Sequence, residues 1–410
     1  IARLKFDLNQ ERMGQVRRLE KMLRPETLEQ KLEAYLLIQD AECYRLPSAP
    51  GILDDEDDYR GAERAAERFG REAVDHPELL ERLLPRLVSE GNTLCHYFGR
   101  GISQATEDRE QMFAALIKEQ ATTQPEPRSL CLLRGFIDAL SRVDPRQYDR
   151  CLHAIIADPN NVAWYPDLEN GTSSGFHRRA IAALAQESCS PEFYGRFAYG
   201  RIHEGLNDRE LADVLGTLRQ REKSLRACIN IVSMRFHDLD LPYVIDHLLV
   251  EVAAEILLEA AQQSWRDRDC NGYDLGVIAK AVFRSTKGEA FSNCFIDSFL
   301  NIESGPCWSP NFLQDTWAAL AEAQPDSFLE GMKALYESDR LIIFRFSLDR
   351  LVSPVKWVGQ AAIRAWCCKD PDANCPVVAE LMLSEDLLVN QDGGSSDQDL
   401  LSFLLAQSST

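Results

Sequence analysis

The stretch that decides the fold is "ALSRVDPRQYDRCLHAI", Ala139 to Ile155, because it returns as "ALAEAQPDSFLEGMKAL", Ala319 to Leu335. Both copies carry Ala-Leu, then a proline, then an aromatic residue three positions after the proline. Proline is tolerated in the first turn of a helix, where its missing N–H would have had no partner. Each copy therefore predicts a helix that ends, a second helix that begins at the proline, and a ring that packs back on the first helix.

Two partial copies extend the pattern. "AWCCKDPDANCPVVAELM", Ala365 to Met382, repeats the spacing of alanine and proline, and "SPEFYGRF", from Ser190, repeats only the proline and the aromatic residues. The offsets fit a unit of about 45 residues, in the range of HEAT and armadillo repeats. Short segments with apolar residues at spacings of three and four fill most of the chain between the copies. We predict an all-α fold, an α-solenoid of stacked antiparallel helix pairs of the HEAT, armadillo or TPR kind.

Breaks in this helical pattern divide the chain. Residues 1–45 predict an N-terminal helical hairpin, and 46–58, rich in Pro, Gly and acids, predict a linker or long loop. The repeat array is expected over 59–388. Residues 389–410 predict a flexible acidic segment and a short terminal helix. Since the chain begins with Ile, we expect it to be a fragment or a processed product.

Composition excludes several classes of protein. Lys and Arg number 45 against 65 for Asp and Glu, and the formal charge of −20 disfavours binding to nucleic acid. No apolar run reaches the ~18 residues of a membrane helix, so we predict no membrane partner. The 12 cysteines form no CxxC pair, which favours reduced thiols in a cytoplasmic protein. A zinc site using Cys367 and Cys375 is the less favoured alternative.

Motifs that would indicate an enzyme are nearly absent from the sequence. It has no P-loop, no GxGxxG and no HExxH, and "RSTKGEA", Arg284 to Ala290, predicts only a loop between helices. We therefore predict no cofactor and no catalysis by this fragment. The alternative function is an all-helical metal-dependent phosphohydrolase of HD type, in which His203 and the pair His237-Asp238 would hold the metal.

A long loop is the first predicted binding surface. The stretch "NNVAWYPDLENGTSSG", Asn160 to Gly175, places Trp164, Tyr165 and Asp167 among turn residues. Long loops with aromatic residues often bind partners in repeat proteins. The alternative, equally open, is that both rings fill the space between adjacent repeats.

An acidic stripe is the second predicted surface. Glu251, Glu255 and Glu259 recur every fourth residue on one predicted helix. Like charges at this spacing cost a few tenths of a kcal/mol per pair. The stripe is either a recognition ridge for a basic partner or the solvated face of a solenoid helix, and the second interpretation is favoured.

The segment "GRFAYGRIHEGLNDRELADVLGTL", Gly195 to Leu218, resembles the C-terminal helical-repeat regions of large bacterial STAND-type antiphage NTPases, and the similarity extends over residues 128–340. In that family the repeat array senses proteins, and the NTPase lies elsewhere in the chain. The resemblance implies a non-catalytic sensor domain that binds a phage or host protein. No NTPase motif is present, so no catalytic residue is carried over.

Overall fold

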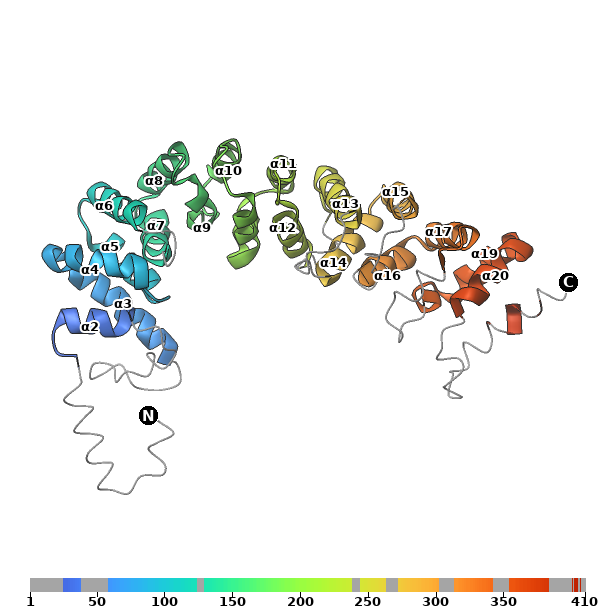
Figure 1. The fold of residues 1–410 in the computed structure, drawn as a ribbon, viewed down its shortest axis with the longest axis horizontal. Helices are drawn as coiled ribbons and strands as arrows, with labels where there is room; N and C mark the ends of the chain where they lie inside the picture. The colour runs from blue at the N-terminus through green and yellow to red at the C-terminus, as the bar shows by residue number, and fades with distance from the viewer. Residues whose placement is uncertain are drawn as a thin grey trace, which may run out of the picture. The chain divides into compact units, whose positions relative to one another are not determined.

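The computed structural model describes residues 25–37, 58–123, 129–237, 244–262, 272–301, 313–341 and 354–382, with 400, 402–404 and 406. Every regular element within these ranges is a helix (Figure 1), which confirms the predicted all-α helical-repeat fold. The chain divides into two compact units, residues 1–175 and 176–410, which we describe separately. Among the described residues, no helix is both long and apolar enough to cross a membrane.

The first unit is a two-layered stack of helices. Helices α3, α5 and α7 pack side by side in one layer, and α4, α6 and α8 form the second layer. The elements are α2 (Leu28–Leu36), α3 (Asp58–Val74), α4 (Pro77–Glu90), α5 (Cys95–Ala105), α6 (Arg109–Thr122), α7 (Cys131–Val143), α8 (Pro145–Ala157), the 3₁₀ turn η2 (Val162–Trp164) and α9 (Tyr165–Leu168).

Glycines let the helices of the first layer touch backbone to backbone. A Cβ added at Gly135 of α7 would lie 1.7 Å from the carbonyl oxygen of His96 on α5, and one at Gly101 of α5 would lie 2.0 Å from the carbonyl oxygen of Glu67 on α3. No side chain fits at such distances. The close packing of this layer therefore requires that the residues at positions 101 and 135 are glycines, which have no side chain.

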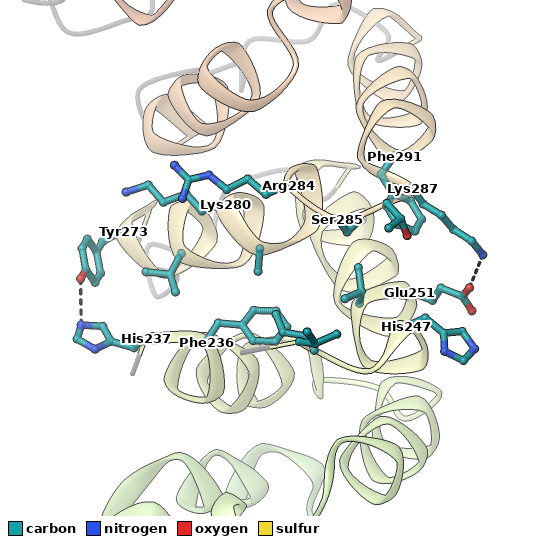
Figure 2. A pocket seen from close by; sticks show the side chains of 16 residues that line it. Phe236, His237, His247, Glu251, Tyr273, Lys280, Arg284, Ser285, Lys287 and Phe291 are labelled. Atoms are coloured by element: carbon teal, nitrogen blue, oxygen red, sulfur yellow. Dashed lines mark hydrogen bonds and ion pairs between the residues drawn. The ribbon is translucent and has the colours of Figure 1, made fainter. Parts of the chain in front are cut away.

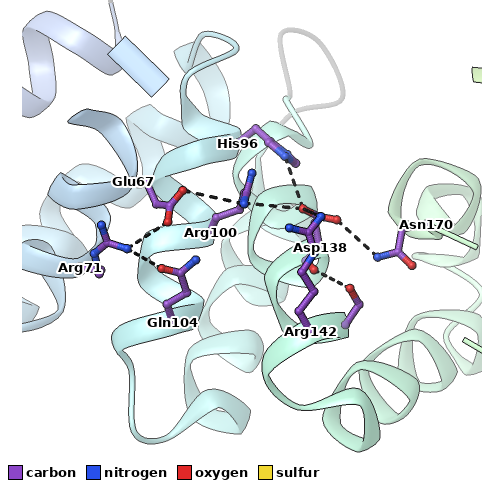
Figure 3. A network of polar contacts seen from close by, with 9 residues as sticks. Glu67, Arg71, His96, Arg100, Gln104, Asp138, Arg142 and Asn170 are labelled. Carbon is purple, nitrogen blue, oxygen red and sulfur yellow. Dashed lines mark hydrogen bonds and ion pairs between the residues drawn. The ribbon is translucent and has the colours of Figure 1, made fainter. Parts of the chain in front are cut away.

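Charged side chains cross the same layer on its polar side (Figure 3). Arg71 on α3 donates to Glu67 at 3.0 Å, and Arg100 on α5 lies 4.0 Å from Glu67 and 3.8 Å from Asp138 on α7. His96 lies 3.9 Å from Asp138. These ion pairs link three consecutive helices of the layer, each pair contributing up to about 1 kcal/mol at such partly exposed positions.

The second unit continues the same two-layered pattern. Element η3 and helices α12, α14 and α16 pack in sequence as one layer, and α10, α11, α13, α15 and α17 form the other. The elements are α10 (Phe176–Leu184), the 3₁₀ segment η3 (Pro191–Gly205), α11 (Asp208–Arg219), α12 (Leu225–His237), α13 (His247–Gln262), α14 (Gly272–Phe283), α15 (Gly288–Leu300), α16 (Gln314–Ala323), α17 (Pro325–Glu337), η5 (Pro354–Trp357), α19 (Gln360–Lys369) and α20 (Pro371–Met382).

Side-chain pairs join neighbouring repeats of the second unit. Arg219 and Glu255 are 36 residues apart, Lys287 and Glu251 are 36 apart, and Arg284 and Glu322 are 38 apart. Within each layer of this unit, from α11 to α17 and from α12 to α16, successive helices begin 37–47 residues apart. This range includes the predicted unit of about 45 residues.

The predicted hairpins are present in the structure. Pro145 begins α8 and Pro325 begins α17, and the rings that follow, Tyr148 and Phe328, are fully buried. The ring of Phe328 lies 6.2 Å from that of Trp317 on the preceding helix α16. Buried rings at this position hold the two helices of a hairpin together.

One segment of the predicted helical array is not α-helical. Residues Pro191–Gly205 form a 3₁₀ segment with a kink, because Gly200 and Arg201 have φ angles of 64° and 62°. A left-handed conformation is unfavourable for a residue with a side chain, so this backbone is strained at Arg201.

Several predicted regions lie outside the described residues. They include most of the hairpin 1–45, all of the linker 46–58 except Asp58, and most of the segment 389–410. The array predicted over 59–388 is described as helices in both units.

Candidate functional site

The strongest candidate site is a pocket in the second unit, built from α12, α13, α14 and the start of α15 (Figure 2). Its volume is about 600 Å³, within the range of ligand-binding pockets. The apolar lining comes mainly from Phe236 on α12, Val250 on α13, Val277 on α14 and Phe291 on α15. Side chains from four elements thus converge on one hollow.

Hydrogen bonds fix the wall made by α12 and α13. Arg235, near the end of α12, donates to the buried Asp208 at 2.8 Å, and the backbone N–H of Asp246 donates to the same carboxylate at 3.0 Å. Asp246 in turn accepts a hydrogen bond from the N–H of Leu248 at the start of α13, and this bond, followed by that from Arg209, lowers the pKa of Asp246. The start of α13 is therefore held against the end of α12 beside the pocket.

Cations dominate the charged part of the lining. Lys280 lies in the last turn of α14 and Arg284 directly follows the end of that helix, and Figure 2 shows the two side chains extending along the same side of it. At the other end of the pocket, Lys287 donates to Glu251 at 2.5 Å, and this hydrogen bond lowers the pKa of Glu251. The lining therefore holds three Lys or Arg side chains against one carboxylate, within a chain whose formal charge is −20.

The ion pairs of these cations are exposed. Arg284 donates to Glu322 at 2.6 Å, with side chains 46% and 57% exposed. Lys280 is exposed and has no ion-pair partner within the described part of the chain. An exposed ion pair contributes little to the free energy of folding, so a ligand carboxylate can replace Glu322 as the partner of Arg284 at small cost.

The predicted loop aromatics do not lie at the surface. Trp164 is 5% exposed and Tyr165 is fully buried, while Asp167 is half-buried beside them. The hydroxyls of Tyr165 and Tyr148 donate to the two carboxylate oxygens of the buried Glu169, at 3.0 and 2.7 Å. The geometry matches the alternative in which both rings fill the interior, because the sequence around them folds into η2 and α9 rather than an open loop.

The glutamate stripe has cationic partners from neighbouring repeats. Glu255 accepts from Arg219 on α11 at 2.5 Å, and Glu259 lies 3.7 Å from the same guanidinium. Glu251 pairs with Lys287 and lies in the pocket lining. The repulsion among the three glutamates of α13 is therefore offset by Arg219 and Lys287, which lie outside that helix.

The two histidines of the alternative metal site have separate environments. His203 is buried and its Nδ1 lies 3.1 Å from the carbonyl oxygen of Phe197, and burial lowers its pKa. His237 lies at the pocket edge with its Nε2 3.1 Å from the hydroxyl of Tyr273, and Asp238 is outside the described residues. Within the described ranges, no group of three or more His, Cys, Asp or Glu side chains is placed to hold a metal ion. Cys367 and Cys375, which are both buried, belong to no such group within these ranges.

Sequence reasoning missed the cations of the pocket. The stretch Arg284–Ala290 was expected to be only a connecting loop, and it does connect α14 to α15. The available signal was the pair Lys280 and Arg284 on one face of a helix in an acidic chain. Comparison of this chain with protein-family models, curated proteins and solved structures gives no match.

Proposed function

We propose that this chain is a non-catalytic, protein-binding helical-repeat domain, and that it holds its partner at the pocket lined by α12 to α15. The observation that carries the proposal is the pocket itself, where apolar side chains such as Val277 and Phe291 share one surface hollow with exposed cations. Partner residues bind most tightly where a buried apolar anchor is surrounded by polar contacts. A stack of helix pairs supplies the rigid wall that such a pocket requires.

The resemblance to STAND-type sensor regions supports a more specific role. Under it the chain is the recognition part of a larger bacterial defence protein, working in the cytoplasm, and its partner is a phage or host protein. Of the residues predicted from the sequence, Glu251 belongs to this surface, since it lines the pocket. Participation of Glu255, Glu259 and Asp167 in binding stays a prediction.

The proposal is tested by capture of partners on the immobilised chain, followed by measurement of binding with the purified partner. The informative variant is Val277→Asp, which places a carboxylate in the pocket. Val143→Asp is the matched control, because Val143 is 46% exposed on α7 in the other unit and does not line the pocket. Alanine at Trp164 or Tyr165 would test folding instead, since both side chains are buried.

We expect Val277→Asp to lower the recovery and the affinity of a captured partner at least about tenfold, with Val143→Asp unchanged and both variants folded by circular dichroism. Failure to enrich any protein over a blank resin would refute the protein-binding function. A partner that binds Val277→Asp as well as the native chain would place recognition on another surface.

A further inference from the structure

We infer that the pocket is specific for an acidic peptide segment that carries a large apolar anchor, a partner chemistry that deepens the proposed protein-binding function and rests on it. The occupant is then defined by two properties: carboxylates that meet Lys280 and Arg284, and an aromatic or aliphatic side chain that enters the apolar part of the pocket.

The carboxylates are required by the charge of the lining. Lys280 is in the last turn of α14 and Arg284 follows four residues later, directly after the helix, so the two like charges repel each other. The described residues offer no carboxylate to Lys280, and the one offered to Arg284 belongs to Glu322, an exposed side chain on the next repeat. A ligand carboxylate between the two cations removes the repulsion and forms charge-assisted hydrogen bonds with both.

The apolar anchor is required by the remaining lining. Val244, Ile245, Val277 and Phe291 are apolar lining residues that are not buried, and Val244 is 89% exposed. The apolar surface that they leave in contact with water is covered only by an apolar side chain. At about 600 Å³ the pocket takes a few side chains of an extended or helical segment and not a whole domain. An inorganic anion alone would leave this apolar part hydrated.

Other anionic macromolecules fit the pocket less well. Nucleic acid is bound through many phosphate contacts, whereas this lining has three Lys or Arg side chains beside Glu251, in a chain of formal charge −20. A peptide can place two or three carboxylates around a single anchor, which matches the number of cations in the lining.

The test uses the full chain and a random peptide library displayed on phage, followed by synthetic fluorescein-labelled peptides in anisotropy titrations. The pocket variant is Lys280→Glu with Arg284→Glu. The matched control is Lys118→Glu with Arg146→Glu, the same change of charge at two exposed residues of α6 and α8. Phe291→Ala tests the anchor, and thermal melts show whether each variant is folded.

We expect the native chain to enrich peptides that have at least two Asp or Glu beside an aromatic or large aliphatic residue. Binding of a selected peptide should weaken at least about tenfold in the pocket variant, weaken in Phe291→Ala, weaken as NaCl is raised, and stay unchanged in the control.

Enrichment of peptides without acidic residues, or equal binding by the pocket variant and the native chain, would overturn the inference while leaving protein binding intact. A second outcome would also overturn it: no library peptide is enriched, while a protein partner is captured by the native chain and is not captured by Val277→Asp. Co-sedimentation with vesicles of anionic phospholipid that is lost in the pocket variant and kept in the control would assign the pocket to a lipid surface instead.

Discussion

Substitution of Gly135 by alanine is the sharpest test of how the first unit is packed. The added methyl group would lie 1.7 Å from the carbonyl oxygen of His96, and a real Cβ is not found closer than about 3 Å to such an atom. Helices α5 and α7 must therefore move apart locally by more than 1 Å. Backbone cannot rotate away as a flexible side chain does, so the cost lies near the upper end of the 1–3 kcal/mol typical of overpacking. Alanine gains about 1 kcal/mol of helix propensity over glycine, which leaves a net destabilisation of about 2 kcal/mol.

The matched control is Gly216→Ala on α11, where an added Cβ meets no atom within 4 Å. This variant keeps the gain in helix propensity without the clash and should be stabilised by about 0.5–1 kcal/mol. Urea denaturation followed by circular dichroism measures both variants, and hydrogen exchange of peptides from α5 and α7 locates the effect. If Gly135→Ala were as stable as Gly216→Ala, the backbone contact between α5 and α7 would not exist in solution.

Two further predictions concern titrating groups. Lys287→Gln removes the hydrogen bond that lowers the pKa of Glu251, so this pKa should rise toward its ordinary value in NMR titrations of the carboxyl carbons, and no rise would mean that the ion pair does not form. In the native chain the stability from this pair is present above the ordinary pKa of a glutamate and is lost as pH falls through the lowered pKa. Burial raises the pKa of Cys151 and Cys228 to about 12, so at pH 8 only about one in 10⁴ of these thiols is ionised. Iodoacetamide should therefore label the exposed Cys294 and Cys368 before Cys151 and Cys228, as followed by peptide mass spectrometry; early labelling of Cys151 would contradict its burial.

The hairpins could be predicted from the sequence because their signals are local. A proline at the first helical position and a ring three residues later act within one hairpin, and the structure places Pro145 and Tyr148 as expected. The ion pairs between repeats could not be predicted in the same way, because they are not local. Pairs such as Arg219 and Glu255 are made by exposed side chains on different helices, whose positions show no pattern in the sequence alone.

The environments of predicted site residues could not be obtained from the sequence because they depend on contacts between segments. Trp164 and Tyr165 stand among turn residues, which suggested a surface, yet the carboxylate of Glu169 binds the hydroxyls of Tyr165 and Tyr148 in the interior. A buried carboxylate is tolerated only with such hydrogen bonds. The two tyrosines belong to different helices, so this arrangement depends on how α8 and α9 pack.

Ion pairs between neighbouring repeats lie beside the apolar part of the pocket. Lys287 bonds to Glu251 and Arg284 to Glu322, which are 36 and 38 residues away in the chain. At the same separations from Lys280 the chain has Val244 and Ala318, neither of which can pair with a cation. Lys280 and the exposed Val244 both line the pocket, so a cation without an ion-pair partner among the described residues shares the lining with an apolar side chain in contact with water. The paired side chains join the repeats, and the unpaired ones beside them are the groups that a ligand can bind.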